Sequence, residues 1–426
     1  MKILGIETSC DETAAAVVEG TKVETPQLKV GASLWVLSNV VSSQIEIHKK
    51  YGGVVPEVAA REHVLNILPV INEALEKAGV KYPTQPPLIK GRSLTPLLYK
   101  EGLGEVKGID AIAVTTGPGL ITSLQVGVET AKVLSYVWKI PVISVNHIEG
   151  HIYANFIREF PISNFQFPIL ILTVSGGHTM LILMKGHGKY KVIGETLDDA
   201  AGEAFDKAAA MMNIGYPGGP VISAEADNFR VSSVECRING QNNKSQIENR
   251  QSAISLPRPM INSNDYNFSF SGLKTALLYK IQKDPTSPFN NKGLRGASPN
   301  WKKRIPEYCL EFQQAVIDVL VAKTVRAAKE LKVYPVKSGE AGARQSEQFN
   351  KVKTIMLSGG VAANMELRKQ MAEKIKKEIP GSNFLIPDLK FTTDNAAMIA
   401  TAGYFKALRK KFTPWQKLKA DCNLEL

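Results

Sequence analysis

Residues 2–19, KILGIETSCDETAAAVVE, decide the fold of this chain. The apolar runs Lys2–Glu7 and Thr13–Glu19 flank the polar turn TSCD, and this pattern predicts a β-hairpin. Residues 169–184, ILILTVSGGHTMLILM, repeat the pattern with the turn SGGH. Two halves that each begin with a hairpin closed by a small polar turn predict a duplicated two-lobe architecture.

Short apolar strands alternate with helical segments through the rest of the chain, which is typical of an α/β fold. We expect an actin-like fold, the duplicated architecture of sugar kinases, heat-shock proteins and actin. The N-terminal lobe is predicted to span residues 1–145 and the C-terminal lobe residues 146–393, while a helix at 394–411 can return to the first lobe. Polar or glycine-rich stretches predict insertions in the second lobe near residues 231–267, 283–304 and 334–350.

Apolar spacing places the helices that bear on function. A helix is predicted over residues 57–78, with a break near Pro69, because proline cannot donate the backbone hydrogen bond of a helix interior. Another begins near His147, directly after a strand at 141–145. In the second half a helix is predicted from Asp199 to Asn213, and the sequence SGGVAAN opens a further one.

Composition limits the class of protein. The chain has 426 residues, 44% of them hydrophobic, which is enough for a core in each of two lobes. A formal charge of +12 fits a polyanionic partner such as RNA or DNA, and it fits a simple need for solubility equally well. No apolar run approaches the ~20 residues of a membrane span, and early acids argue against a signal peptide. Four cysteines without a CxxC pair indicate a reducing compartment, so we expect a cytoplasmic protein with no membrane partner.

Two histidines are the first candidate ligands for a metal ion. His147 and His151 are four residues apart, so a helix would place both rings on one face, ~6 Å apart along its axis. The segment reads HIEGH and differs from the zinc-protease pattern HExxH, because Glu149 points ~200° away from His147 around the helix. Asp394, at a predicted helix start after a strand, is a candidate third ligand. Two histidines and one carboxylate suit Fe(II) or Zn, although a pair of surface histidines would show the same spacing.

Paired glycines after apolar strands indicate a phosphate-binding site. In VSGGHT (174–179) and LSGGVAAN (357–364) the backbone can approach a phosphate closely and direct its N–H groups at it. Asn364 can hydrogen-bond a ribose or a base edge. Either loop alone is weak evidence, since Gly-Gly turns are common, but the two together favour nucleotide binding.

Acidic and basic clusters complete the candidates. Asp11 and Glu12 lie on the first hairpin turn, where they could reach a cleft or simply contact water. Spacing places Asp206 on one helix face with Asp199 and Glu203, where a carboxylate could hold ribose hydroxyls. The C-terminal run KALRKKFTPWQKLK (406–419) mixes basic and aromatic residues, a composition that suits RNA and equally a solvated helix end.

Together the motifs resemble the tRNA N6-adenosine threonylcarbamoyltransferase family, long described as O-sialoglycoprotein endopeptidases. The resemblance covers nearly the whole chain outside the insertions, and the opening ETSCDET is similar to the bacterial and mitochondrial branch. The motifs occur in the family's order: GIETSCDET, HKKYGGVVPEVAAREH, GPGL, VNHIEGHIYA, VSGGHT, LDDAAGEAFDK, YPGGP, LPRPM, FSFSGLKTAL, LSGGVAAN and FTTDNAAMIA.

The resemblance implies an actin-like fold with one bound metal ion, Fe(II) or alternatively Zn, on His147, His151 and Asp394. It implies tRNA and threonylcarbamoyl-AMP as substrates, and as partners a paralogous non-catalytic subunit and a small P-loop ATPase. The family's contacts to the adenylate map onto Val174, Ser175, Gly176, Gly177, His178, Asp206, Gly219 and Asn364.

The implied reaction is acyl transfer to N6 of the adenosine adjacent to the anticodon, in tRNAs that read codons starting with adenine, with release of AMP. We expect Asp11 or Glu12 to accept the proton. Basic residues in Lys283–Arg304 are expected to contact the tRNA backbone. The alternatives are an ATP-dependent kinase or chaperone of the same fold, a metallopeptidase, and an RNA-binding scaffold.

Overall fold

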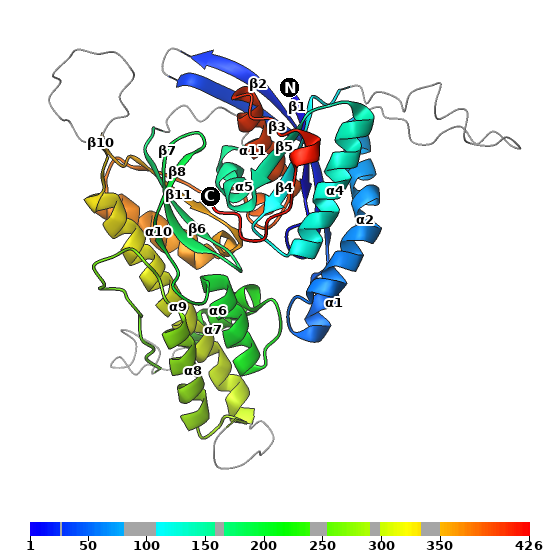
Figure 1. Ribbon diagram of the computed structural model, residues 1–426. Coiled ribbons are helices and arrows are strands. Elements are labelled where there is room, and N and C mark those ends of the chain that lie inside the picture. Colours follow the sequence, from blue (N-terminus) through cyan, green and yellow to red (C-terminus); the bar gives the residue numbers. More distant parts are fainter. Residues whose placement is uncertain (26–27, 81–107, 158–165, 239–253, 290–298, 334–349) are drawn as a thin grey trace, which may run out of the picture. The chain divides into compact units, whose positions relative to one another are not determined.

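The computed structural model describes residues 1–25, 28–80, 108–157, 166–238, 254–289, 299–333 and 350–426 (Figure 1). The chain forms two units. One comprises Met1–Phe165 with Pro387–Leu426, and the other comprises Gln166–Ile386. Most of the predicted insertion at 334–350, and parts of those at 231–267 and 283–304, lie outside the described residues. Among the described helices, none is both long and apolar enough to cross a membrane.

The first unit is built on a five-stranded mixed sheet of order β3-β2-β1-β4-β5. Strands β1, β2 and β3 form an antiparallel meander, and β4 and β5 continue parallel to β1. Every residue of β4 is buried, as expected for a parallel strand covered on both faces. The bounds are β1 Lys2–Glu7, β2 Glu12–Thr25, β3 Leu28–Ser43, β4 Ala111–Gly117 and β5 Val142–Asn146.

Helices cover both faces of this sheet. Helices α2 (Pro56–Lys77) and α4 (Ile121–Trp138) pack an apolar core against one face. Helix α11 (Ala396–Leu408) is buried almost entirely and lies close to β1, where a Cβ in place of Gly5 would overlap its backbone. The predicted break at Pro69 was wrong, because α2 is one continuous helix. Ile67 and Val70 are buried on either side of the proline, so packing holds both halves in line.

The second unit repeats the topology. Its sheet has the order β12-β11-β6-β7-β8, in which β6, β7 and β8 form the meander and β11 and β12 run parallel to β6. The same order and strand directions in both units confirm the duplicated actin-like fold that the two hairpins predicted. The bounds are β6 Ile169–Val174, β7 Thr179–Gly186, β8 Lys189–Glu195, β11 Thr354–Ser358 and β12 Asn383–Leu385, with a separate ribbon of β9 Lys332–Val333 and β10 Asn350–Lys351.

The helices of the second unit pack around one large apolar core. Strand β8 and helix α7 were not predicted from the sequence. Asp199 precedes α6 instead of lying on it, so it does not share a helix face with Asp206. The bounds are α6 Ala201–Met212, α7 Gly218–Ile238, α8 Ser271–Lys283, α9 Pro299–Glu330 and α10 Met365–Glu378.

The division between the units differs from the expected limits at residues 145 and 393. Helix α5 (His147–Tyr153) packs against α11 and so belongs to the first unit, and the chain leaves that unit only after it. Helix α11 itself returns to the first unit, as the sequence allowed.

Candidate functional site

The three predicted metal ligands come together in the first unit. Asn146 ends β5 and caps α5, its Oδ1 accepting hydrogen bonds from the N–H groups of Ile148 (2.8 Å) and Glu149 (3.3 Å). This cap starts the helix at His147, so His147 and His151 lie one turn apart and meet edge to face, with ring centroids separated by 4.6 Å. Asp394 Oδ1 lies 3.6 Å from His147 Nε2 and 3.2 Å from His151 Nε2.

The position of Asp394 is fixed by its neighbours in the sequence. It precedes α11, as predicted, and Asn395 caps that helix by accepting a hydrogen bond from Met398 N at 3.1 Å. It does not follow a strand directly, because the 3₁₀ turn η4 (Leu389–Phe391) comes between. A short turn tied to a capped helix holds the carboxylate as rigidly as a strand end would.

Glu7 holds His147 from the side opposite Asp394. Its Oε2 lies 3.2 Å from His147 Nδ1 and accepts a hydrogen bond from Thr115 Oγ1 at 2.7 Å, while Oε1 accepts one from Ser9 N at 2.5 Å. Burial alone would lower the pKa of His147, but Asp394 and Glu7 outweigh it and raise the pKa to about 9. Glu7 was not among the sequence candidates, because a carboxylate that closes a buried strand gives no sign of which side chain it will meet.

The triad fits a metal ion. One ligand atom from each residue lies within 4.8 Å of the other two, and both histidines are buried. Neither ring nitrogen of His151 has a hydrogen-bond partner among the described residues, apart from the short approach of Asp394. Buried imidazole nitrogens rarely lack a partner, and a metal ion would supply one. Two imidazoles and a carboxylate are the donor set of Fe(II) and Zn sites, with positions left for substrate.

Glu149 takes no part in this cluster. Its Oε2 pairs with Lys406 Nζ at 2.6 Å and its Oε1 lies 3.9 Å from Arg409, so the side chain is committed away from the histidines. A metallopeptidase of the HExxH type needs this glutamate beside the metal. The geometry therefore supports the interpretation that HIEGH is not a metallopeptidase motif of the HExxH type.

Asp11 and Glu12 lie in the same unit, after the end of β1. Asp11 is buried, and Glu12 begins β2 and accepts a hydrogen bond from Ser43 Oγ at 3.2 Å. Burial, then the neighbouring Asp11, then Asp394 raise the pKa of Glu12 well above its usual value. The influence of Asp394 on Glu12 indicates that this carboxyl group lies within electrostatic range of the triad. A carboxyl group with a raised pKa is a stronger base once ionised, which suits proton transfer near neutral pH.

The two glycine loops meet in the second unit. They follow β6 and β11, which are parallel neighbours, and Thr173 Oγ1 lies 2.9 Å from Ser358 Oγ. Gly359 has φ +88°, and a Cβ there would overlap the carbonyl oxygen of Val174. Gly176 and Gly177 are exposed, and a Cβ at either would meet no atom within 4 Å. The second loop thus packs under the first, whose backbone stays open to a ligand.

The other residues that are expected to contact the adenylate also contribute to the structure of the second unit. Asp206 Oδ1 accepts a hydrogen bond from Gly218 N at 2.6 Å, and Gly219 lies in the first turn of α7. Asn364 caps α10 through Leu367 N (2.9 Å), and its Nδ2 donates to Ser223 Oγ at 2.8 Å and Gln313 Oε1 at 2.7 Å. Val174, Ser175, Gly176, Gly177 and His178 form the β6–β7 turn, closed by the hydrogen bond from Ser175 N to His178 O at 2.8 Å.

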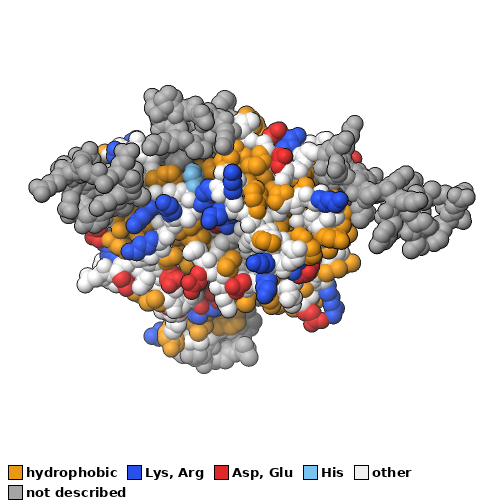
Figure 2. Space-filling model, turned by 45° about the horizontal axis from the view of Figure 1, so that its top comes forward, with side chains coloured by type: hydrophobic (Ala, Val, Ile, Leu, Met, Phe, Trp, Pro, Cys, Tyr) orange, Lys and Arg blue, Asp and Glu red, His pale blue; other side chains and the backbone are white. Residues whose placement is uncertain are grey.

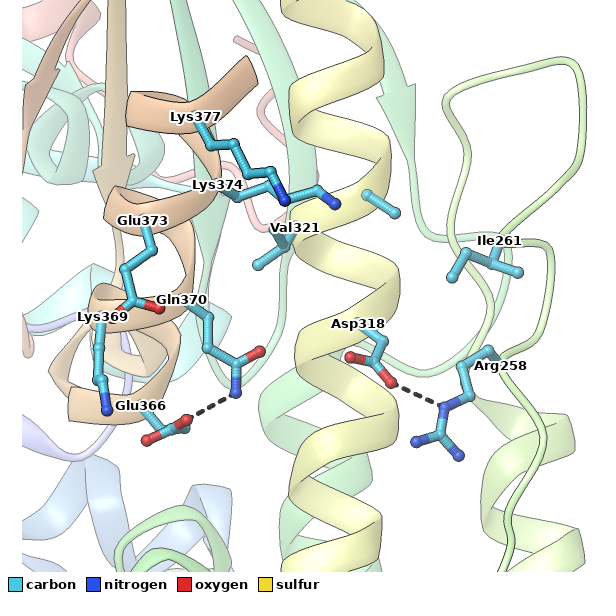
Figure 3. Close-up of a pocket in the computed structure, with 11 residues that line it drawn as sticks. Arg258, Ile261, Asp318, Val321, Glu366, Lys369, Gln370, Glu373, Lys374 and Lys377 are labelled. Carbon is cyan, nitrogen blue, oxygen red and sulfur yellow. Dashed lines mark hydrogen bonds and ion pairs between the residues drawn. The ribbon is translucent and has the colours of Figure 1, made fainter. Parts of the chain in front are cut away.

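A separate groove of about 780 Å³ lies between α9 and α10 (Figure 3). Its charges are largely matched: Arg258 Nε pairs with Asp318 at 2.9 Å, and Glu366 pairs with Arg230 at 2.7 Å. It contains none of the residues expected to bind the metal ion or the adenylate or to accept the proton, although Arg258 belongs to the motif LPRPM. The lining side chains are those of Arg258, Ile261, Asp318, Val321, Ala322, Glu366, Lys369, Gln370, Glu373, Lys374 and Lys377.

Fold and site together define an actin-like protein with a His-His-carboxylate centre. The family model "tRNA N6-adenosine threonylcarbamoyltransferase" matches residues 35–84 and 98–401. The chain belongs to this family and is therefore a transferase. It is 43% identical to the enzyme of that name from Dehalococcoides mccartyi (96% of this chain, 95% of that protein). It is 44% identical to the one from Bacillus subtilis (95% and 90%). A solved structure, the activator of 2-hydroxyisocaproyl-CoA dehydratase from Clostridium difficile with bound ADPNP, aligns with a TM-score of 0.41 at 10% identity, covering 97% of this chain and 99% of that one.

Proposed function

We propose that the chain transfers a threonylcarbamoyl group from threonylcarbamoyl-AMP to N6 of the adenosine adjacent to the anticodon, in tRNAs that read codons starting with adenine. The observation that carries the proposal is the convergence of His147, His151 and Asp394 in a member of this transferase family. We expect the protein to act in the cytoplasm, which fits a tRNA-modifying enzyme.

The reaction exchanges a carbon–oxygen bond for a carbon–nitrogen bond and removes one proton from N6. The N6 lone pair attacks the carbamoyl carbon, the bond from that carbon to the phosphate oxygen breaks, and AMP leaves with the electron pair. His147, His151 and Asp394 would hold a divalent ion, Fe(II) by preference or Zn, which supplies Lewis acidity toward the carbamoyl oxygen.

The remaining groups of the chain have defined parts in this scheme. Backbone N–H groups of Gly176 and Gly177 bind the phosphate that leaves, and Asp206, Gly219 and Asn364 contact the nucleoside. Glu12 or Asp11 accepts the proton that N6 loses. Glu7 is a positioning residue, since it keeps the Nδ1 proton of His147 and leaves Nε2 free as a ligand.

A paralogous non-catalytic subunit and a small P-loop ATPase complete the proposed assembly. An exposed apolar stripe on α2 supports docking of the paralogue: Val64, Leu65 and Leu68 are 62%, 68% and 55% exposed. Hydrophobic side chains also gather, in Figure 2, on the side where Figure 1 draws α2 and α4. Changing Leu65 and Leu68 to Asp should abolish co-elution with the paralogue, whereas Lys77→Gln, farther along α2, should not.

The test of the proposed function is a transfer assay with labelled threonylcarbamoyl-AMP, tRNA and the two partner proteins. Label should enter tRNA that reads codons starting with adenine and should not enter tRNA lacking adenosine beside the anticodon. The rival reading, an ATP-dependent kinase or chaperone of the same fold, predicts ATP hydrolysis by the chain without RNA. ATP turnover with no labelled tRNA would decide for that rival.

A further inference from the structure

A strip of unpaired lysines and exposed rings lies on the first unit, away from the metal centre. The hydrogen bond from Thr413 N to Val142 O (2.9 Å) ties the segment after α11 to the start of β5. Tyr136 and Trp415 then meet edge to face, with ring centroids 5.4 Å apart. These two contacts set residues 410–417 alongside the end of α4.

No ion pair among the described residues neutralises the positive charge of this strip. Lys139, Lys410, Lys411 and Lys417 are exposed, and within the described part of the chain none of them forms an ion pair. Glu149 on α5 is buried. Its carboxylate already pairs with Lys406 and Arg409, so it does not pair with the lysines of the strip.

The backbone conformation gives a second, independent indication that the side chains of Lys139 and Lys410 have a function. Lys139 and Lys410 both have φ +56°, the left-handed conformation that favours glycine. Lys410 ends α11 in a Schellman motif, in which Lys410 N donates to Ala407 O and Lys411 N donates to Lys406 O. Glycine would relieve strain at each position, yet both carry a long cation.

Exposed rings complete the surface. Tyr136 is 64% exposed and Phe412 is 44% exposed, so each presents an aromatic face to solvent within the lysine strip. Spaced cations can contact successive phosphates, and aromatic faces can stack on unpaired bases or sugars. A bare cation cluster would not need the rings, and an apolar docking face would not carry so many lysines.

We infer that the strip formed by Tyr136, Lys139, Lys410, Lys411, Phe412 and Lys417 binds the sugar–phosphate backbone of tRNA outside the reacting loop. This inference rests on the proposed function, which makes tRNA the substrate. The strip adds affinity and orientation without choosing the target base, because phosphates carry no sequence information.

The test uses the full-length chain and the variant Lys139→Gly/Lys410→Gly. Glycine suits the backbone at both positions, so helix ends and thermal stability should be kept or improved. The affinity for tRNA should nevertheless fall, and the slope of log affinity against log salt should become shallower by about 1.5 for two lost phosphate contacts. The Kd for AMP should not change.

The matched control is Lys77→Gln/Lys132→Gln. It removes the same charge from the same unit, but these lysines already pair with Glu73 and Glu129 at 2.6 Å. Its salt slope should stay that of the unmodified chain. A second variant, Phe412→Ala, should weaken tRNA binding roughly five- to hundredfold with the salt slope unchanged.

Three results would overturn the inference. One is tRNA binding by the double glycine variant that equals that of the unmodified chain. Another is an equal loss in the lysine control, which would mean that only net charge matters. The third is binding of the unmodified chain to anionic phospholipid vesicles that the variants lose, while the affinity of the variants for tRNA is unchanged. Failure of the proposed function has a different signature, since the unmodified chain would then transfer no label to tRNA.

Discussion

The two units of this protein share one sheet topology and carry different chemistry at equivalent places. In the first unit the turn after the leading strand is TSCD, and a carboxylate, Glu7, closes that strand. In the second unit the equivalent turn is SGGH, and the neighbouring parallel strand is also followed by paired glycines. One unit thus offers side-chain ligands and acids, and the other offers open backbone N–H groups.

This difference teaches what the topology does and does not decide. In each unit the order of strands brings the loops after parallel neighbours to one edge of the sheet. Which groups meet there depends on a few loop residues, so a duplicated fold can hold a metal ion on one copy and a phosphate on the other. If the comparison is right, damage to one unit should leave the ligand of the other in place.

The largest effect should come from His147→Ala/His151→Ala. Losing both imidazoles leaves Asp394 as the last of the three ligands, so metal content should fall from stoichiometric to background. Elemental analysis of purified protein measures this, and calorimetry with AMP should show an unchanged second-unit site. The cross-control Asn364→Ala should keep its metal. Stoichiometric metal in the double histidine variant would show that the ion is held elsewhere.

Two glycine substitutions in the second unit should distinguish the glycine that supports the loop from the glycine that contacts the phosphate. Gly359→Ala places a side chain at φ +88° against the Val174 carbonyl, and we expect a loss of about 1–3 kcal/mol in the free energy of unfolding. Gly177→Ala meets open space, so its stability should change by no more than about 0.5 kcal/mol. Its affinity for AMP should fall about ten- to hundredfold, since a methyl group blocks the phosphate. Equal stability of the two variants in thermal unfolding would contradict this packing.

Much of this contrast could be predicted from the sequence, because it depends on local patterns. The hairpins, the histidine spacing and the helix start at Asp394 are all short-range signals, and the triad assembled as predicted. Glu7 could not be found this way, since its contact with His147 depends on β1 and β5 flanking β4. The prediction of a break at Pro69 failed for the same reason, because packing on both sides of the proline outweighs its local preference to end the helix.

The position of Glu7 gives the third prediction, within the first unit alone. Glu7→Gln keeps the shape of the side chain and removes its charge, so metal affinity should fall about ten- to hundredfold. Ser9→Ala is the matched change, because Ser9 Oγ also lies 3.1 Å from His147 Nδ1 but carries no charge. Competition with a chelator measures both. An equal, small loss in the two variants would mean that the charge of Glu7 does not tune His147.

The smallest effect is expected for Lys302→Gln/Lys303→Gln on the second unit. The sequence offered Lys283–Arg304 as a tRNA contact with six basic residues, but Lys292 and Arg295 lie outside the described residues. Arg304 forms ion pairs with Asp284 and Glu307, each at 3.2 Å, so its charge is already paired within the protein.

Lys302 and Lys303 remain exposed near the start of α9, and we expect their replacement to lower the magnitude of the salt slope by less than the ~1.5 expected for Lys139→Gly/Lys410→Gly. Because the neighbouring ring of Trp301 is buried and neither lysine has a positive φ, we expect their replacement to weaken tRNA binding less than that of Lys139 and Lys410. Titrations of both variants against the same tRNA across a salt series rank the two surfaces directly. A larger change for the α9 pair would assign the main RNA contact to the second unit and reverse the comparison.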